Sequence, residues 1–97
     1  MTESRFKCAA VKLIRKELPN AWIYHPSDKW ISGIPDLFVL DHGVLAAIEL
    51  KVGKNTATRL QLITLERIGA AGAITAICRD AAGIRDVIEK IRLRRTA

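Results

Sequence analysis

The chain has 97 residues, a length that suits one domain with its own hydrophobic core, so we expect a single domain over residues 1–97. Apolar residues make up 49% of it but never run for the roughly 18 positions that a membrane span needs, and the charged amino-terminal segment lacks a signal-peptide core, so we expect a soluble, intracellular protein. The net charge of +6 favours a polyanionic partner such as nucleic acid, although solubility alone would also explain it.

A first helix is predicted from a cap at Thr2 to about residue 18, where Pro19 and Asn20 stop it. Its apolar stripe, which would pack on a sheet, consists of Phe6, Ala10, Leu13 and Ile14. Glu3 and Glu17 lie at the two ends of the same stripe, so one of these carboxylates could point toward a functional site. The alternatives are an acid favourably placed at a helix amino terminus for Glu3 and a solvated helix end for Glu17.

Residues 21–25 have the aromatic and branched content of a short strand, and residues 26–32 then form a loop. His25 and Lys29 could contact a DNA backbone from this region. Trp30 could stack on a base, or it could simply cover the core or a subunit contact.

Residues 32–51 concentrate the chemistry of the chain, because two apolar runs meet across a short polar turn and carry acids inside them. A two-residue loop at His42-Gly43, with glycine second, is typical of a β-hairpin and would place Asp36 opposite Glu49. Residues directly opposite share a face of the sheet, and strand alternation puts Lys51 on that face too. The pattern therefore predicts a cluster of two acids and one lysine.

Two facing carboxylates need a partner for their charge, because like charges opposite each other on a sheet are unfavourable and burial raises the cost. A divalent cation is the simplest partner, and hard oxygen ligands suit magnesium or manganese. The pattern also allows an ordinary hairpin in which Asp36 caps a strand and Glu49 and Lys51 are solvated.

The next segment is a polar connector followed by a helix over about residues 57–69, with Asn55 or Thr56 as its cap. Lys54 in the connector and Arg59 in the helix could line an approach for phosphates.

The remaining elements are structural in character. Residues 73–78 predict a buried strand beside the hairpin, and residues 81–94 predict a last helix whose apolar face closes the core. Cys8 and Cys78 fall in a predicted helix and a predicted apolar strand, far apart, so we expect buried small side chains rather than a disulfide or a zinc site.

The run Gly33-Ile34-Pro35-Asp36, followed by Ile48-Glu49-Leu50-Lys51 and then by Gln61 in the next helix, resembles the PD-(D/E)XK nuclease superfamily. More specifically it is similar to the VRR-Nuc (virus-type replication and repair nuclease) family, in its stand-alone, phage-like form. The resemblance covers nearly the whole chain. It implies a restriction-endonuclease-like α/β fold, with a central mixed sheet of about four strands flanked by helices in the order α-β-β-β-α-β-α.

The resemblance implies a metal-dependent DNA endonuclease. Its metal would be Mg²⁺, with Mn²⁺ able to substitute, in one or two sites formed by Asp36, Glu49 and the backbone carbonyl of Leu50. Lys51 would act on the attacking water, either as a base or as an electrostatic stabiliser. The residues that the resemblance assigns to catalysis are Asp36, Glu49, Lys51, Gln61 and Glu3.

The implied substrate is branched DNA, cut by a homodimer in the manner of a Holliday-junction resolvase, in the cytoplasm of a bacterium or a phage-infected host cell. Two alternatives remain: a non-catalytic basic DNA-binding module, and a nuclease subunit that needs a partner. Asp36, Glu49 and Lys51 argue against the first, because a pure binding domain gains nothing from acids near phosphates. An inactive purified chain that still binds magnesium would favour the second.

Overall fold

The computed structural model describes residues 1–26 and 32–95. Its elements are α1 (Glu3–Glu17), β1 (Trp22–Tyr24), β2 (Leu37–Asp41), β3 (Val44–Leu50), α2 (Arg59–Ala70), β4 (Ile74–Cys78) and α3 (Ala81–Arg95). The four strands form one sheet in the order β1-β2-β3-β4, antiparallel except for the parallel pair β3 and β4. The element order and the mixed sheet confirm the predicted fold class.

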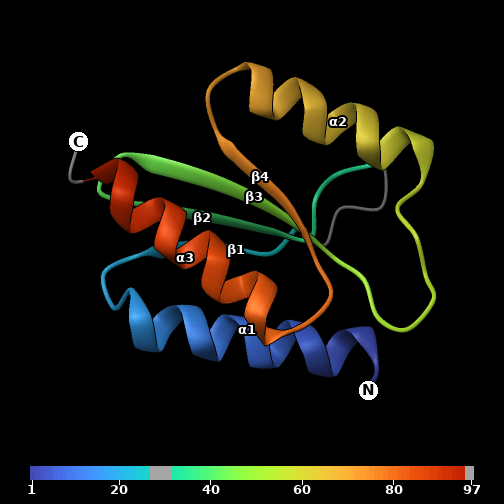
Figure 1. Cartoon of the computed structure of the whole chain (residues 1–97), viewed down its shortest axis with the longest axis horizontal. Helices are drawn as coiled ribbons and strands as arrows, with labels where there is room; N and C mark the ends of the chain where they lie inside the picture. Colours follow the sequence, from blue (N-terminus) through green and yellow to red (C-terminus); the bar gives the residue numbers. More distant parts are fainter. Residues whose placement is uncertain (27–31, 96–97) are drawn as a thin grey trace.

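The sheet lies between two helical layers, with α1 and α3 packed together on one face and α2 on the other (Figure 1). We call these the core face and the α2 face. Thr75 of β4 points toward α2, because its hydroxyl would lie only 3.4 Å from a Cβ added to Gly69 of that helix. Thr75 therefore belongs to the α2 face. Ala47 of β3 and Phe38 of β2 follow Thr75 in register across the sheet, so they share this face.

The main hydrophobic core fills the space between the core face and the pair α1 and α3. Both helices carry their apolar residues at helical spacing, and these side chains meet alternate residues of the strands. Each fully buried Leu, Ile or Val contributes roughly 1.5–3 kcal/mol relative to an exposed one. The largest fully buried side chains of this core are Ile14, Leu18, Leu37, Ile48, Leu50, Ile84 and Ile91.

The start of α2 differs from the prediction. Thr58, not Asn55 or Thr56, is the cap, and its hydroxyl accepts a hydrogen bond from the third residue of the helix. The preceding connector stays non-helical because Arg79 donates to the backbone carbonyls of Asn55 at 2.7 Å and Gly53 at 3.4 Å. A long-range contact therefore selects among several residues that are all competent to cap.

The two cysteines have different environments. Cys78 is buried as predicted, and burial raises the pKa of its thiol to about 11. The prediction for Cys8 was wrong, because this side chain is exposed. Position 8 lies nearly opposite Phe6 around the helix, and the buried stripe of α1 follows Phe6, Ala10 and Ile14.

In the part of the chain that the structure describes, no helix has the length and apolar character needed to cross a membrane.

Candidate metal and active site

The predicted hairpin forms with the predicted register. His42 and Gly43 form its turn, with φ of 48° and 82°, the positive values that a two-residue type I′ loop requires. Pairing of Leu37 with Ile48 then sets Asp36, one residue before β2, opposite Glu49. Because paired residues share a face, both acids lie on the side of the sheet that α2 covers.

Three carboxylates meet at this end of the hairpin. One oxygen each from Glu3, Asp36 and Glu49 lies within 4.8 Å of the others, and we call these residues the acid cluster. They come from the first turn of α1, the residue before β2, and β3, so the cluster exists only in the folded chain. Glu17 is not a member, since it lies at the far end of α1, 3.9 Å from Arg92.

The Gly-Ile-Pro-Asp run positions Asp36. Gly33 has a φ of 82°, and a Cβ there would lie 2.8 Å from Cγ of Leu60 in α2, so only glycine fits this approach. Pro35 is buried, and its ring fixes the backbone φ directly before Asp36. Asp36 is then fixed by the backbone N–H of Leu50, which donates to its Oδ2 at 2.7 Å.

Glu49 is the most perturbed acid of the cluster. Its side chain is buried, with 1% exposure, and its Oε2 has no hydrogen-bond partner among the residues that the structure describes. Burial raises its pKa from 4.5 to about 8, with further increases from its hydrogen bond to Asp36 and from the charges of Asp36 and Glu3, against an opposing effect of Lys51. Two carboxyl groups that share a hydrogen bond must hold a proton between them.

The acid cluster fits a divalent cation. A protonated Glu49 with an unpartnered buried oxygen is costly, and a cation would replace that proton and give the oxygen a ligand. Three carboxylate oxygens are the hard ligands that Mg²⁺ and Mn²⁺ prefer. Lys51 is close enough for its charge to lower the pKa of Glu49, which places it beside the same site.

The other predicted site residues are more dispersed. Gln61 lies in the first turn of α2, where its Oε1 accepts the Thr58 N–H at 2.9 Å as half of a capping box. Exposed side chains are found at Lys54, Arg59 and His25. Lys29 and Trp30 lie outside the described residues.

Two groups of polar contacts, one at the connector after the hairpin and one at the hairpin turn, were missed by sequence reasoning. Arg79 holds the connector that follows the hairpin, through the two carbonyl contacts described above. Asp41, buried at the hairpin turn, pairs with Arg95 near the end of α3 and lies 3.1 Å from the His42 ring. Arg79 lies 24 and 26 residues from the carbonyls that it contacts, and Arg95 lies 54 residues from Asp41. No local sequence signal reveals contacts between residues so far apart.

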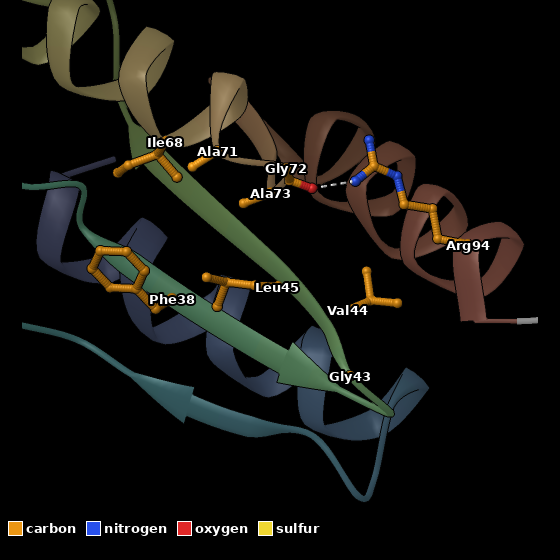
Figure 2. Close-up of a pocket in the computed structure, with 9 residues that line it drawn as sticks. All are labelled: Phe38, Gly43, Val44, Leu45, Ile68, Ala71, Gly72, Ala73 and Arg94. Carbon is orange, nitrogen blue, oxygen red and sulfur yellow. Dashed lines mark hydrogen bonds between the residues drawn. The ribbon is translucent and has the colours of Figure 1, made fainter.

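A cavity of about 710 Å³ lies at the other end of β3, between the hairpin turn and the end of α2 (Figure 2). Phe38, Leu45 and Ile68 form part of its apolar lining, and Arg94 reaches over it to donate a hydrogen bond to the carbonyl of Gly72 at 2.8 Å. The acid cluster is not part of this lining.

Of three comparisons with known proteins, one gave a match. No family model matches the chain, and a search of curated proteins gave no match either. A solved structure described as a VRR_NUC domain is similar, with a TM-score of 0.74 and 26% sequence identity, over 90% of this chain and 94% of the other. This similarity supports the resemblance to the VRR-Nuc family that the motif residues indicate.

Proposed function

We propose that this chain is a metal-dependent DNA endonuclease that hydrolyses phosphodiester bonds. The similarity to a solved VRR_NUC domain supports a nuclease function. The observation that carries the metal dependence is the acid cluster, where Glu49 lies beside two more acids and its buried Oε2 has no hydrogen-bond partner among the described residues.

Glu3, Asp36 and Glu49 would hold Mg²⁺, with Mn²⁺ as a substitute. The carbonyl of Leu50 is a fourth candidate ligand, because the N–H and C=O of one residue point to the same side of a strand and the Leu50 N–H points at Asp36. A bound ion would supply a water of lowered pKa and neutralise charge on the phosphate.

The side chains around the acid cluster divide the remaining tasks. Lys51 holds a positive charge beside Glu49, where it can orient the attacking water or stabilise the charged transition state. Gln61 uses its carbonyl oxygen in the capping box, so its amide nitrogen is the group that would donate to a phosphate oxygen.

DNA would approach over exposed basic side chains of the connector, of α2 and of the segment after β1. Lys54 in the connector and Arg59 at the start of α2 follow directly after the hairpin that carries Glu49 and Lys51. His25 follows β1, and the proposal extends to Lys29 in the next segment. Phosphate contacts of this kind fix the position of the DNA but read no sequence, so selectivity would come from the shape of the substrate.

We further propose that the substrate is branched DNA and that the active form is a homodimer, as in a Holliday-junction resolvase. Two active sites related by a two-fold axis would cut two strands of a junction in a symmetric pair. The competing functions are a non-catalytic DNA-binding module and a nuclease subunit that needs a partner. The cost of the buried acids argues against a pure binding module.

The test is cleavage of end-labelled four-way junction, flap, duplex and single-stranded DNA by the purified chain, with Mg²⁺, with Mn²⁺ and with chelator. Wild type is compared with Glu49→Ala and with Glu66→Ala, which removes an exposed acid of α2. We expect cutting by wild type and Glu66→Ala that disappears in Glu49→Ala and in chelator. Metal-dependent cutting by purified Glu49→Ala would refute the assignment of the site.

Sedimentation equilibrium together with the junction assay tests the finer proposal. A dimer that cuts junctions in symmetric pairs supports it, and a monomer that nicks all substrates equally contradicts it. Absence of cutting by a chain that still binds Mg²⁺ would favour the partner-dependent subunit.

A further inference from the structure

The α2 face of the sheet carries an exposed apolar surface that none of these functions uses. Trp22, Tyr24, Leu40 and Leu45 are 56%, 47%, 41% and 36% exposed, and we call them the aromatic surface. Strand register joins them, because Trp22 pairs with Leu40 and Leu40 pairs with Leu45. Contiguous exposed apolar side chains on a small protein mark a binding surface.

The two aromatic rings of this surface are stacked. The centroids of Trp22 and Tyr24 lie 5.6 Å apart, and their planes differ by 14°. Both rings stand on β1, which is an edge strand of the sheet that residues 1–26 and 32–95 form. Nearly parallel, exposed rings present flat π-faces on which a nucleobase of any type can stack.

The aromatic surface is continuous with the acid cluster. Tyr24 pairs with Phe38, and Phe38 lies two residues after Asp36 on the same face of β2. From strand spacings, the backbone at Tyr24 is on the order of 8–9 Å from that at Asp36. A nucleic acid whose phosphate lies at the acid cluster can therefore place neighbouring bases on the rings.

The size of this surface favours bases over a second copy of the chain. A Trp or Tyr side chain has about 150–250 Å² of surface that it can bury, so the two half-exposed rings together offer on the order of 200 Å² for binding. Leu40 and Leu45 add to this area but leave it well below the roughly 800 Å² that each partner gives to a standard stable interface.

The charge around the surface also suits a nucleic acid. On the far side of Phe38 and Leu45, the cavity in Figure 2 has an apolar lining with the guanidinium of Arg94 at its rim. A nucleotide has a base with flat apolar faces and an anionic phosphate. It therefore matches an apolar surface that lies beside a cation.

We propose that unpaired nucleobases of the substrate stack on Trp22 and Tyr24, so that the preferred DNA carries single-stranded nucleotides beside the scissile phosphate. This inference rests on the proposed nuclease function and specifies its substrate. A base stacked on an aromatic side chain strengthens binding about 5-fold to about 100-fold. A branch point or flap supplies such bases, whereas a continuous duplex does not.

The test measures binding in chelator, where no cleavage occurs, by fluorescence anisotropy of a labelled duplex with a short thymidine arm. A matched DNA replaces the nucleotides of the arm with abasic residues, which keeps the phosphates and removes the bases. We expect wild type to bind the abasic arm at least about fivefold more weakly, and Trp22→Ala/Tyr24→Ala to bind both DNAs equally.

Two further variants separate stacking from other effects. Trp22→Phe/Tyr24→Phe retains two rings and is expected to keep the discrimination against the abasic arm, which also controls for folding. Leu62→Ala removes an exposed apolar side chain of α2, 48% exposed, and should leave the discrimination unchanged.

Equal binding of both arms by wild type would overturn the inference, and so would discrimination that survives in Trp22→Ala/Tyr24→Ala. Sedimentation equilibrium covers the competing occupant: if the double alanine substitution converts a dimer into a monomer, the surface is a subunit interface and the inference fails. Cleavage with Mg²⁺ is scored separately, so discrimination without cleavage would reject the nuclease function while leaving base stacking established.

Discussion

Replacement of Glu49 by glutamine tests whether the acid cluster is costly before a metal binds. Glutamine has nearly the same shape as glutamate but cannot ionise, so Glu49→Gln keeps the packing and removes the charge. We expect the variant to be more stable than wild type at alkaline pH in chelator, and the two to converge at acid pH. The reason is the raised pKa of Glu49, about 8 in the folded chain against 4.5 for the unperturbed group.

The pH range of the effect follows from the direction of this pKa shift. Below pH 4.5 the carboxyl is protonated in both the folded and the unfolded chain, so it imposes no cost. Between pH 4.5 and about 8 the unfolded chain loses this proton and the folded chain keeps it, so the free energy of unfolding falls as the pH rises. Each pKa unit corresponds to about 1.4 kcal/mol, so the total loss is about 4–5 kcal/mol.

Urea unfolding of wild type and Glu49→Gln over a pH series in chelator measures this difference. The free energy of unfolding of the variant minus that of wild type should grow by several kcal/mol from pH 4.5 to 8. Glu66→Gln, at an exposed position, should give a difference that does not change with pH. Parallel curves for wild type and Glu49→Gln would refute the reasoning.

Metal provides the second half of this test. Mg²⁺ at a hundredfold excess over its Kd would stabilise the folded wild type by about 2.7 kcal/mol, and Glu49→Gln should gain much less. Because binding displaces the proton from Glu49, the affinity of wild type for Mg²⁺ should rise with pH up to about pH 8. An affinity that is independent of pH would show that Glu49 is not a ligand.

Three further substitutions test the contacts that hold the hairpin and its flanking segments in place, by urea unfolding. Arg79→Ala removes both hydrogen bonds that Nη1 donates to the connector and should cost roughly 1 kcal/mol, whereas an unchanged stability would contradict a structural role for these bonds. Asp41→Asn leaves the partly buried Arg95 without its carboxylate and should cost about 3 kcal/mol, whereas an unchanged stability would contradict a buried ion pair. Gly33→Ala combines a positive φ with a clash at Leu60 and should cost about 1–3 kcal/mol, together with weaker Mg²⁺ binding because Asp36 moves.

The hairpin shows why part of the site could be predicted from the sequence. Side chains alternate with a period of two, so the turn at His42-Gly43 fixes the pairing of every residue in both strands. A register shift by one residue would bury Asp36 and Glu49 in the main core and expose Leu37 and Ile48. The apolar pattern and the turn therefore select the same register.

Other features depend on contacts that the sequence pattern does not contain. The position of Glu3 was one of two possibilities, because the helical stripe places Glu3 and Glu17 equally well and only the packing of α1 brings one of them to the sheet. Thr58 was missed as a cap because Asn55 and Thr56 are equally competent and the choice depends on a distant arginine. The exposure of Cys8 has a different origin, because position 8 lies off the apolar stripe of α1 and helical periodicity alone would have placed it outside the core.

The arrangement of the two faces links the placement of the acids to the stability of the fold. Asp36 and Glu49 stand on the same backbone as the neighbouring residues Leu37 and Ile48, which are fully buried in the core face. The carboxylates of the acid cluster repel one another, so they stay close together only if the backbone that carries them cannot move. Close packing of the core face makes this backbone rigid. The buried apolar side chains thus offset a cost of several kcal/mol that the acid cluster imposes in the absence of a cation. A purely structural hairpin would not retain such a cost, because replacing either acid by a neutral side chain would remove it.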